Sequence, residues 1–224
     1  MKQKQHRRRK LKGSSIIEFA VIAPMLFGLL VGTFSLGNGL SRMVQASSVC
    51  RNANVLIVRG FDLAKPENQQ LLVRTAAGLG LNIPGTNTAN PDGKAVIYLT
   101  KVIKVGVKTC AQGVDDWNGN VGSCPNYQKY VIASRIVLGN GTRWQSATGS
   151  PTSSVNSKGE ISDEHIVMIA GNRAQNFSDT AGQNTIVSLL DDEYAYIAEV
   201  FVDAVDLSLP YVLTMETIQV RNVS

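Results

Sequence analysis

The chain has 224 residues, with 22 Lys and Arg against 17 Asp and Glu, and its charge is unevenly distributed. Seven of the basic residues lie in the first twelve positions, which leaves 15 basic against 17 acidic residues elsewhere. The rest of the chain therefore lacks the basic excess that a folded nucleic-acid-binding surface needs, and we expect no nucleic acid partner. About 180 residues follow the first forty, which is enough for one ordinary domain.

The chain opens with a basic segment that is followed by an apolar one. Residues 1–13 carry Lys and Arg but no acidic residue, and no ionisable side chain occurs from Phe19 to Leu40. A helix needs about 20 apolar residues to cross a bilayer, and a basic flank stays in the cytoplasm. The sequence predicts a basic leader over 1–13 and a transmembrane helix over 14–40. A secretory signal cleaved near Gln45 is the alternative, although its apolar region is usually only about 7–15 residues long.

Glu18 is the only charged residue near this apolar segment. A carboxylate in lipid costs about 2–3 kcal/mol at the bilayer centre and less towards the interface, so Glu18 needs a partner. Cleavage after Gly13 would supply one, because the new α-amino group of Ser14 is a cation that Glu18 of a neighbouring subunit can pair with. The other interpretation is that Glu18 extends to the lipid headgroups.

The order of these residues resembles a known processing site. Gly13, then Glu18 and Phe19, is similar to the prepilin-peptidase site of type IV pilins, and the whole run to Pro24 is closer to the TadE-like pseudopilins of the tight-adherence (Tad) pilus system. The resemblance extends loosely to about residue 59, with Cys50 in a stretch where the family pattern favours alanine.

That resemblance implies a function and a set of partners. It implies a minor pilin, or pseudopilin, that a prepilin peptidase cleaves after Gly13 and that serves in the assembly or priming of a Tad-type adhesive pilus. The implied partners are other pilin or pseudopilin subunits, the peptidase, the assembly machinery of the bacterial inner membrane and the lipid bilayer. The implied topology is a single-pass protein with a cytoplasmic leader and a periplasmic or extracellular C-terminal domain, and Glu18, Phe19 and Pro24 are the expected assembly residues.

The apolar helix is expected to continue beyond the membrane as an amphipathic stem over residues 41–60. Apolar residues recur at near-helical spacing at Met43, Val44, Ala46, Val49, Ala53, Leu56 and Ile57. Such a stripe packs against a neighbouring surface, here the domain that follows. Gly60 is the expected end of the helix.

Residues 61–224 are predicted to form an exported α+β domain with a mostly antiparallel sheet. A short helix is expected over Glu67–Leu79, with Leu71, Leu72, Ala76 and Leu79 directed inward, and loops over Thr86–Gly93 and Gly139–Gly159, the second exposed to solvent. Alternating, β-branched sequences predict four strands and a weaker fifth. They are Lys94–Lys108, Tyr127–Leu138, Tyr194–Leu207, Thr217–Val223 and, as the weaker one, His165–Ala170.

The chain has three cysteines, all of which the predicted topology places outside the cytoplasm, where disulfides persist. Cys110 and Cys124 flank a polar loop between two predicted strands and are the favoured pair, since closing about 15 residues stabilises by roughly 3 kcal/mol in the chain-entropy model. Cys50 then remains as a buried thiol or an intermolecular link, and burial is the favoured interpretation.

No catalytic, metal-binding or cofactor motif emerges from the sequence. His165 is the only histidine outside the leader, and Asp116-x-Asn118-x-Asn120 begins a calcium-loop spacing that no later Glu completes. The acidic cluster Asp191–Glu193 is interpreted as a solvated entry to a strand. We therefore expect no enzyme, metal or cofactor. The alternative to the pilin hypothesis is an uncleaved single-pass protein whose exported domain binds a partner or ligand, and an anchored enzyme ranks third.

Overall fold

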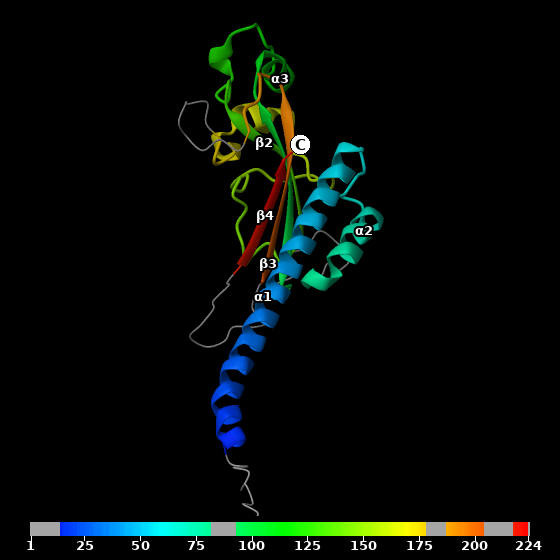
Figure 1. Cartoon of the computed structure of the whole chain (residues 1–224). Coiled ribbons are helices and arrows are strands. Elements are labelled where there is room, and N and C mark those ends of the chain that lie inside the picture. The colour runs from blue at the N-terminus through cyan, green and yellow to red at the C-terminus, as the bar shows by residue number, and fades with distance from the viewer. Residues whose placement is uncertain (1–13, 82–92, 178–186, 204–216, 224) are drawn as a thin grey trace, which may run out of the picture. The chain divides into compact units, whose positions relative to one another are not determined.

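The computed structural model describes residues 14–81, 93–177, 187–203 and 217–223. The chain divides into two compact units between Ser41 and Arg42. The helices and strands are α1 Ser14–Val58, α2 Pro66–Ala76, β1 Ala95–Lys104, α3 Val107–Gly113, β2 Tyr130–Gly139, α4 Asp163–Met168, β3 Tyr194–Asp203 and β4 Thr217–Val223, and Figure 1 labels all of them except β1 and α4. The α+β prediction is confirmed, with a long first helix followed by an antiparallel sheet.

Helix α1 is continuous from the apolar segment into the stem. Among the described residues, it is the one helix that is long and apolar enough to cross a membrane, over Ile17–Val58. The helix ends in a glycine-based cap, in which the N–H of Gly60 donates to Ile57 O at 2.9 Å and the N–H of Phe61 donates to Leu56 O at 3.0 Å. Gly60 has φ +79°, a left-handed conformation that glycine adopts without steric cost. The helix therefore stops where the sequence predicts.

Within the described residues the sheet has four strands in the order β2-β1-β3-β4, and every neighbouring pair is antiparallel. The central strands β1 and β3 pair along nearly their whole length, from Ala95 opposite Val202 to Ile103 opposite Tyr194. The register between β1 and β2 shifts between Lys101 and Val102. Such a bulge places an extra residue in one strand and increases the local twist.

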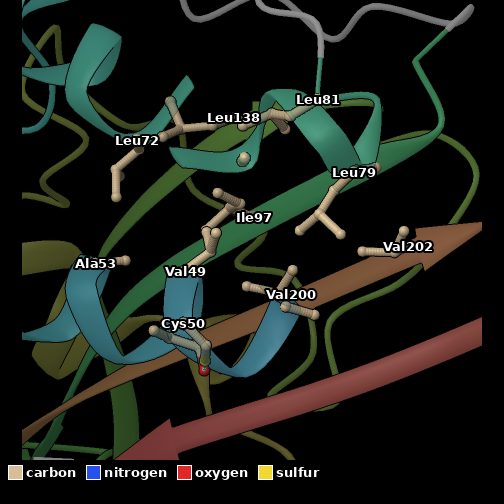
Figure 2. Packing of buried hydrophobic residues seen from close by; sticks show 14 of the residues in the cluster. Val49, Cys50, Ala53, Leu72, Leu79, Leu81, Ile97, Leu138, Val200 and Val202 are labelled. Atoms are coloured by element: carbon tan, nitrogen blue, oxygen red, sulfur yellow. Dashed lines mark hydrogen bonds between the residues drawn. The ribbon is translucent and has the colours of Figure 1, made fainter. Parts of the chain in front are cut away.

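The stem, which is the part of α1 from Arg42 to Val58, packs with α2 on one face of the sheet (Figure 2). The buried positions of this stem are Ala46, Val49, Cys50 and Ala53, with Asn54 beside them. They meet alternate residues of the central strands, such as Ile97 and Val200, which lie opposite each other in the register. The small stem side chains allow the helix to approach the strands closely. Met43 and Val44, which the sequence places in the apolar stripe, are instead mostly exposed.

Cys50 is part of this helix–sheet contact. Its side chain is fully buried, and its thiol donates a hydrogen bond to the carbonyl of Ala198 on β3 at 3.0 Å. The preference for a buried thiol in the stem is therefore confirmed.

Helix α2 supports the outer side of the same core. Leu72, Ala76 and Leu79 are buried as predicted, whereas Leu71 is 47% exposed and the prediction that it points inward is wrong. Gln69 is buried instead, and its side-chain amide donates a hydrogen bond to the carbonyl of Leu63 at 3.0 Å. A buried amide that finds a backbone acceptor does not carry the full cost of its desolvation.

A lobe at one end of the sheet is closed by the disulfide between Cys110 and Cys124. The bridge joins α3 to the segment that leads into β2, and its cysteines are buried with residues of β2 and α4. Helices α3 and α4 pass close to each other at Gly113, where an added Cβ would lie 2.3 Å from Asp163 O. Only a glycine fits this crossing without a shift of the backbone.

The segment expected to be a weak strand, His165–Ala170, is instead occupied by α4 and the turn after it. Ser162 precedes the helix and its hydroxyl accepts a hydrogen bond from His165 N at 3.4 Å. A serine cap followed by Asp163 and Glu164 in the first turn favours a helix over a strand. The apolar residues that suggested a strand, Ile166 and Val167, are buried on one side of this helix.

Helix α3 replaces the last residues of the strand expected over Lys94–Lys108, because β1 ends at Lys104. The helix begins against a carboxylate from a distant part of the chain. Asp192 accepts hydrogen bonds from the backbone N–H groups of Gly106, Lys108 and Thr109 at 3.1, 3.1 and 2.9 Å, and from the Thr109 hydroxyl at 2.7 Å. The expectation of a merely solvated acidic cluster is therefore wrong for Asp192.

The Gly139–Gly159 segment is also not the exposed loop that its composition predicts. Asn140, Ser146 and Thr148 are buried, and the Asn140 side chain donates to the carbonyl of Gly93 at 3.0 Å. The segment covers the sheet face opposite the stem, where it contacts Tyr98 and Glu199. Two other predictions lie outside the described residues, namely most of the loop over Thr86–Gly93 and the end of the third strand at Leu207.

The bonds to Asp192 make its contribution to stability depend on pH. Burial alone raises the pKa of this carboxyl, but the hydrogen bonds from Thr109, Lys108 and Gly106 outweigh it and hold the pKa below its usual value. Because the pKa of Asp192 is lower in the folded than in the unfolded state, this stabilisation is fully present above the unfolded-state pKa, which is about 4 for an Asp carboxyl. It is lost as the pH falls through the folded pKa.

We expect Asp192→Asn to lower the free energy of unfolding at pH 7 by about 1 kcal/mol, the usual contribution of a helix-capping side chain. Asn tolerates the positive φ of 66° at this position, so the change tests the carboxylate and not the backbone. The difference from wild type should shrink between pH 5 and pH 2, measured as melting temperature against pH. Asp191→Asn is the control, since Asp191 makes only a partly exposed pair with Lys104 at 3.3 Å. An Asp192 variant with the same pH profile as wild type would contradict the argument.

Candidate functional site

The first unit, Met1–Ser41, presents an exposed apolar surface along its described helix. Its large side chains are mostly exposed, with Phe19 at 70%, Met25 at 72% and Phe27 at 69% of their surface. Other exposed positions are Ile17, Val21, Ile22, Leu26, Leu29, Leu30, Phe34, Leu36 and Leu40. A helix that is apolar on all sides needs lipid or other apolar helices as surroundings. This surface is the candidate assembly site.

The residues that the sequence assigns to processing and assembly fall at the start of this surface. Gly13 lies outside the described residues, and Ser14 is the first residue of α1. Glu18 and Phe19 follow one helical turn later with exposed side chains. Pro24 lies inside the helix, which continues through it. The carboxylate of Glu18 is thus on the exterior of the helix, where another subunit can reach it.

Three glycines of the apolar helix have free space around them in the described part of the chain. An added Cβ at Gly28, Gly32 or Gly37 would meet no other atom within 4 Å. The spacing of Gly28 and Gly32 places both on one side of the helix and lets a second backbone approach closely. These positions therefore offer space for a neighbouring helix.

A second group of functional interest is a buried charge network on the sheet face opposite the stem. Glu199 of β3 is completely buried and forms an ion pair with Arg221 of β4 at 3.0 Å. The same carboxylate accepts hydrogen bonds from the Ser146 hydroxyl and from Ala147 N. A buried carboxylate is tolerable only when its charge is paired and its lone pairs are satisfied. Glu199 therefore ties β4 and the 140–149 segment to the centre of the sheet.

Arg135 of β2 completes the network from the other side. Its guanidinium donates to the Thr148 hydroxyl at 2.7 Å and to Gly149 O at 2.8 Å, and Thr148 is hydrogen-bonded to Ser146 at 2.7 Å. Burial lowers the pKa of Arg135 to about 10, against the opposing effect of Glu199, which favours the charged form. Arg135 is therefore still a cation at neutral pH. The network holds four separate parts of the chain in one arrangement.

A groove of about 930 Å³ lies beyond the end of α1, within the second unit. Its lining includes Ile57 of α1 and Phe61 after it, Lys101 of β1, Tyr196 of β3 and His165 of α4. His165, the one histidine outside the leader, is thus among the residues that line this groove. Among the described residues, no group of three or more His, Cys, Asp or Glu side chains is placed to hold a metal ion.

These features define a class of protein, namely one with a single candidate membrane-spanning helix among the described residues and a second unit that is an α+β domain with a disulfide. Residues 13–53 match the family model described as TadE-like protein. The match confirms the resemblance found in the sequence, and the N-terminal segment that it covers is TadE-like. No curated protein and no solved structure matches the chain.

The matched segment covers the assembly surface and most of the stem. It ends at Ala53, the last small residue of the stem that is buried against the sheet. The family pattern therefore includes both the exposed apolar helix and the positions that attach it to the following domain. The small residues of the stem are explained by this attachment, because larger side chains would push α1 away from β1 and β3.

The sequence did not reveal the buried network. Glu199 stands in a strand whose other residues alternate as expected, and Ser146 and Thr148 lie in a polar segment typical of exposed loops. One signal was available, since Glu199 is the only acidic residue within the apolar run from Tyr194 to Val202. A charge at an inward position of a central strand indicates a buried partner.

Proposed function

We propose that this chain is a TadE-like minor pilin that is cleaved after Gly13 by a prepilin peptidase and is then incorporated into a Tad-type pilus or its priming complex. The observation that carries the proposal is the exposed apolar first unit, which begins at the TadE-like motif. In this role the protein works by packing and charge pairing, without catalysis. Its partners are other pilin or pseudopilin subunits, the peptidase and the assembly machinery of the inner membrane.

The proposed mechanism follows from the order of the parts. The basic leader holds the N-terminus in the cytoplasm while α1 crosses the bilayer and the second unit folds outside. Removal of the leader leaves Ser14 with a cationic α-amino group. This amine pairs with Glu18 of a neighbouring subunit as apolar helices pack together, so that neither charge faces lipid alone. Gly28 and Gly32, where an added Cβ would meet no other described atom within 4 Å, allow the close approach that this packing needs.

The first test is the N-terminal sequence and mass of the chain recovered from membranes with and without its prepilin peptidase. We expect a mature chain that starts at Ser14 only when the peptidase is present. Gly13→Leu should leave the leader attached, because a bulky side chain blocks a site built around glycine. Gly37→Leu is the control, since it places the same change inside the helix and away from the cleavage site. A leader retained by the wild-type chain in the presence of the peptidase would contradict the proposal.

The alternative function is an uncleaved single-pass membrane protein whose exported domain binds a partner or ligand. The groove beyond α1 favours it, because its lining combines apolar side chains such as Phe61 and Ile57 with polar ones such as Lys101. This alternative predicts that Gly13→Leu has no effect on the protein's activity. Piliation of cells carrying that variant distinguishes the two functions.

A further inference from the structure

A second cavity, of about 500 Å³, is lined by residues of the sheet and of the 141–159 segment. Tyr98 of β1 and Arg135 and Val137 of β2 belong to the part of its lining that the sheet supplies. Its volume falls within the range of about 300–1,000 Å³ that is typical of small-molecule sites. This cavity is named the arginine pocket.

The charge of the arginine pocket comes from one residue. Among the described residues that line it, Arg135 is the only charged one, and no Asp or Glu is present. Arg135 is 6% exposed, and its guanidinium carbon lies 5.5 Å from the ring centroid of Tyr98. Its pKa of about 10 keeps it a cation at neutral pH. A buried cation needs a counter-charge as well as hydrogen-bond acceptors.

The described chain does not balance this cation completely. Glu199, the carboxylate that favours the charged form of Arg135, is paired with Arg221 at 3.0 Å. Arg135 is connected to it through two hydroxyl groups. Its Nη2 donates to Thr148, which is hydrogen-bonded to Ser146, and Ser146 donates to the carboxylate. No ion pair joins Arg135 to a carboxylate among the described residues, so the network contains two guanidinium groups for one carboxylate.

One donor of the same guanidinium also has no acceptor in the described chain. The N–H group at Nε of Arg135 is buried and makes no hydrogen bond. A buried donor of a charged group is rarely left unpaired in a folded protein, because the loss of its hydration is then not recovered. The unpaired donor and the missing counter-charge belong to one side chain. An anion in the arginine pocket would supply both the acceptor and the charge.

We propose that the arginine pocket binds the carboxylate of a small sugar acid, such as a uronic acid. A carboxylate carries the single negative charge that balances Arg135, and it matches the donors of a guanidinium. A phosphate group carries a charge of about −1.5 to −2, which exceeds that of the one cation present. An amino acid fits less well, because its ammonium group would find no acidic side chain in the lining.

The remainder of the lining favours a ligand with hydroxyl groups of its own. Val137 and Pro151 add apolar surface, against which the faces of a sugar ring can lie. Every lining residue belongs to the second unit, so the proposal goes beyond pilus assembly and does not depend on cleavage after Gly13. The hydroxyl side chains that line the pocket from the 141–159 segment are Thr142, Ser150, Ser153 and Ser154.

The test is a calorimetric titration of the full chain with D-glucuronate, in a polyoxyethylene detergent that contains no sugar. D-glucose is the matched probe without a carboxylate, and acetate and inorganic phosphate are anionic probes without a sugar ring. We expect glucuronate to bind at least about tenfold more tightly than glucose, the usual effect of a hydrogen bond to a charged group. Acetate and phosphate should bind more weakly than glucuronate, because they lack the hydroxyl groups that the lining can bind.

Two variants place the binding in the arginine pocket. Arg135→Gln should remove the preference for glucuronate over glucose, and near-ultraviolet circular dichroism shows whether this variant is folded. Ser150→Trp leaves Arg135 unchanged and puts a large ring into the lining, and loss of access to the guanidinium should weaken glucuronate binding at least about tenfold. Gln112→Trp is the matched control, since it adds the same ring at an exposed position of α3 that does not line the pocket.

Three results would overturn the proposal. Equal binding of glucuronate and glucose would show that the carboxylate is not recognised. Acetate or phosphate binding as tightly as glucuronate would show a site for small anions in general. Unchanged glucuronate binding to Ser150→Trp would place the ligand elsewhere on the chain, whether or not Arg135→Gln folds. None of these results changes the proposed function in pilus assembly.

Discussion

Glu199→Ala is expected to lower the free energy of unfolding by about 3–5 kcal/mol, the cost of leaving one member of a buried ion pair without its partner. Glu199 is fully buried, and its loss leaves Arg221 without a counter-charge and Ser146 without its acceptor. Because a domain is stable by only about 5–15 kcal/mol in total, the variant should unfold at a much lower urea concentration. Urea titration of the full chain in detergent, followed by near-ultraviolet circular dichroism, measures the change.

Further variants separate the effect of the ion pair from a general loss of stability. Glu164→Ala removes an exposed carboxylate from α4 and should change stability by no more than about 0.5 kcal/mol. The double variant Glu199→Met with Arg221→Met removes both charges and should be clearly more stable than Glu199→Met alone, since no uncompensated charge remains. If the two single changes add up to the effect of the double change, the two side chains do not interact and the network argument fails.

Glu18→Ala is expected to reduce the incorporation of the processed chain into pili by at least about a hundredfold. Loss of one partner from a charge pair shielded from water costs about 3–5 kcal/mol, and 1.4 kcal/mol corresponds to a factor of ten. Glu18 belongs to the first compact unit, so the stability of the second unit should not change. Incorporation is measured as the ratio of the chain in sheared pili to the chain left in membranes.

The matched control is Glu67→Ala, which removes another exposed carboxylate, from the first turn of α2. Cleavage after Gly13 should proceed in both variants. If N-terminal sequencing finds Ser14 as the first residue of each variant, the defect of Glu18→Ala arises after processing. Normal piliation by Glu18→Ala cells would rule out the pairing of Glu18 with the Ser14 amine.

Local patterns in the sequence are sufficient to predict the features that depend on residues close to one another in the chain. The apolar run from Phe19 to Leu40 defines its helix by length and composition alone, and the strand Thr217–Val223 is confirmed to the residue. Cys110 and Cys124 were paired from their positions on either side of one polar loop, a short-range relation. These features depend on neighbours in the chain, which the sequence displays directly.

The features that the sequence did not reveal depend on contacts between distant residues. Helix α3 begins where it does because Asp192, more than eighty residues later, satisfies its first N–H groups. The segment around Ser146 and Thr148 has the composition of an exposed loop, and only the buried charges of Glu199 and Arg135 explain why it is inside. The charge of Glu199 within an apolar run indicates a buried partner, but no local pattern identifies that partner, and none identifies the N–H groups that Asp192 binds.

The burial of Cys50 also bears on how the protein matures. In the oxidising compartment that the proposed topology implies, three thiols allow three different pairings, and only one of them joins Cys110 to Cys124. Docking of the stem on β3 removes Cys50 from reach, because its thiol is then fully buried and bonded to Ala198. The stem therefore protects the correct pairing during oxidative folding, and a chain oxidised before the stem docks risks a trapped, non-native bridge that only thiol exchange can release.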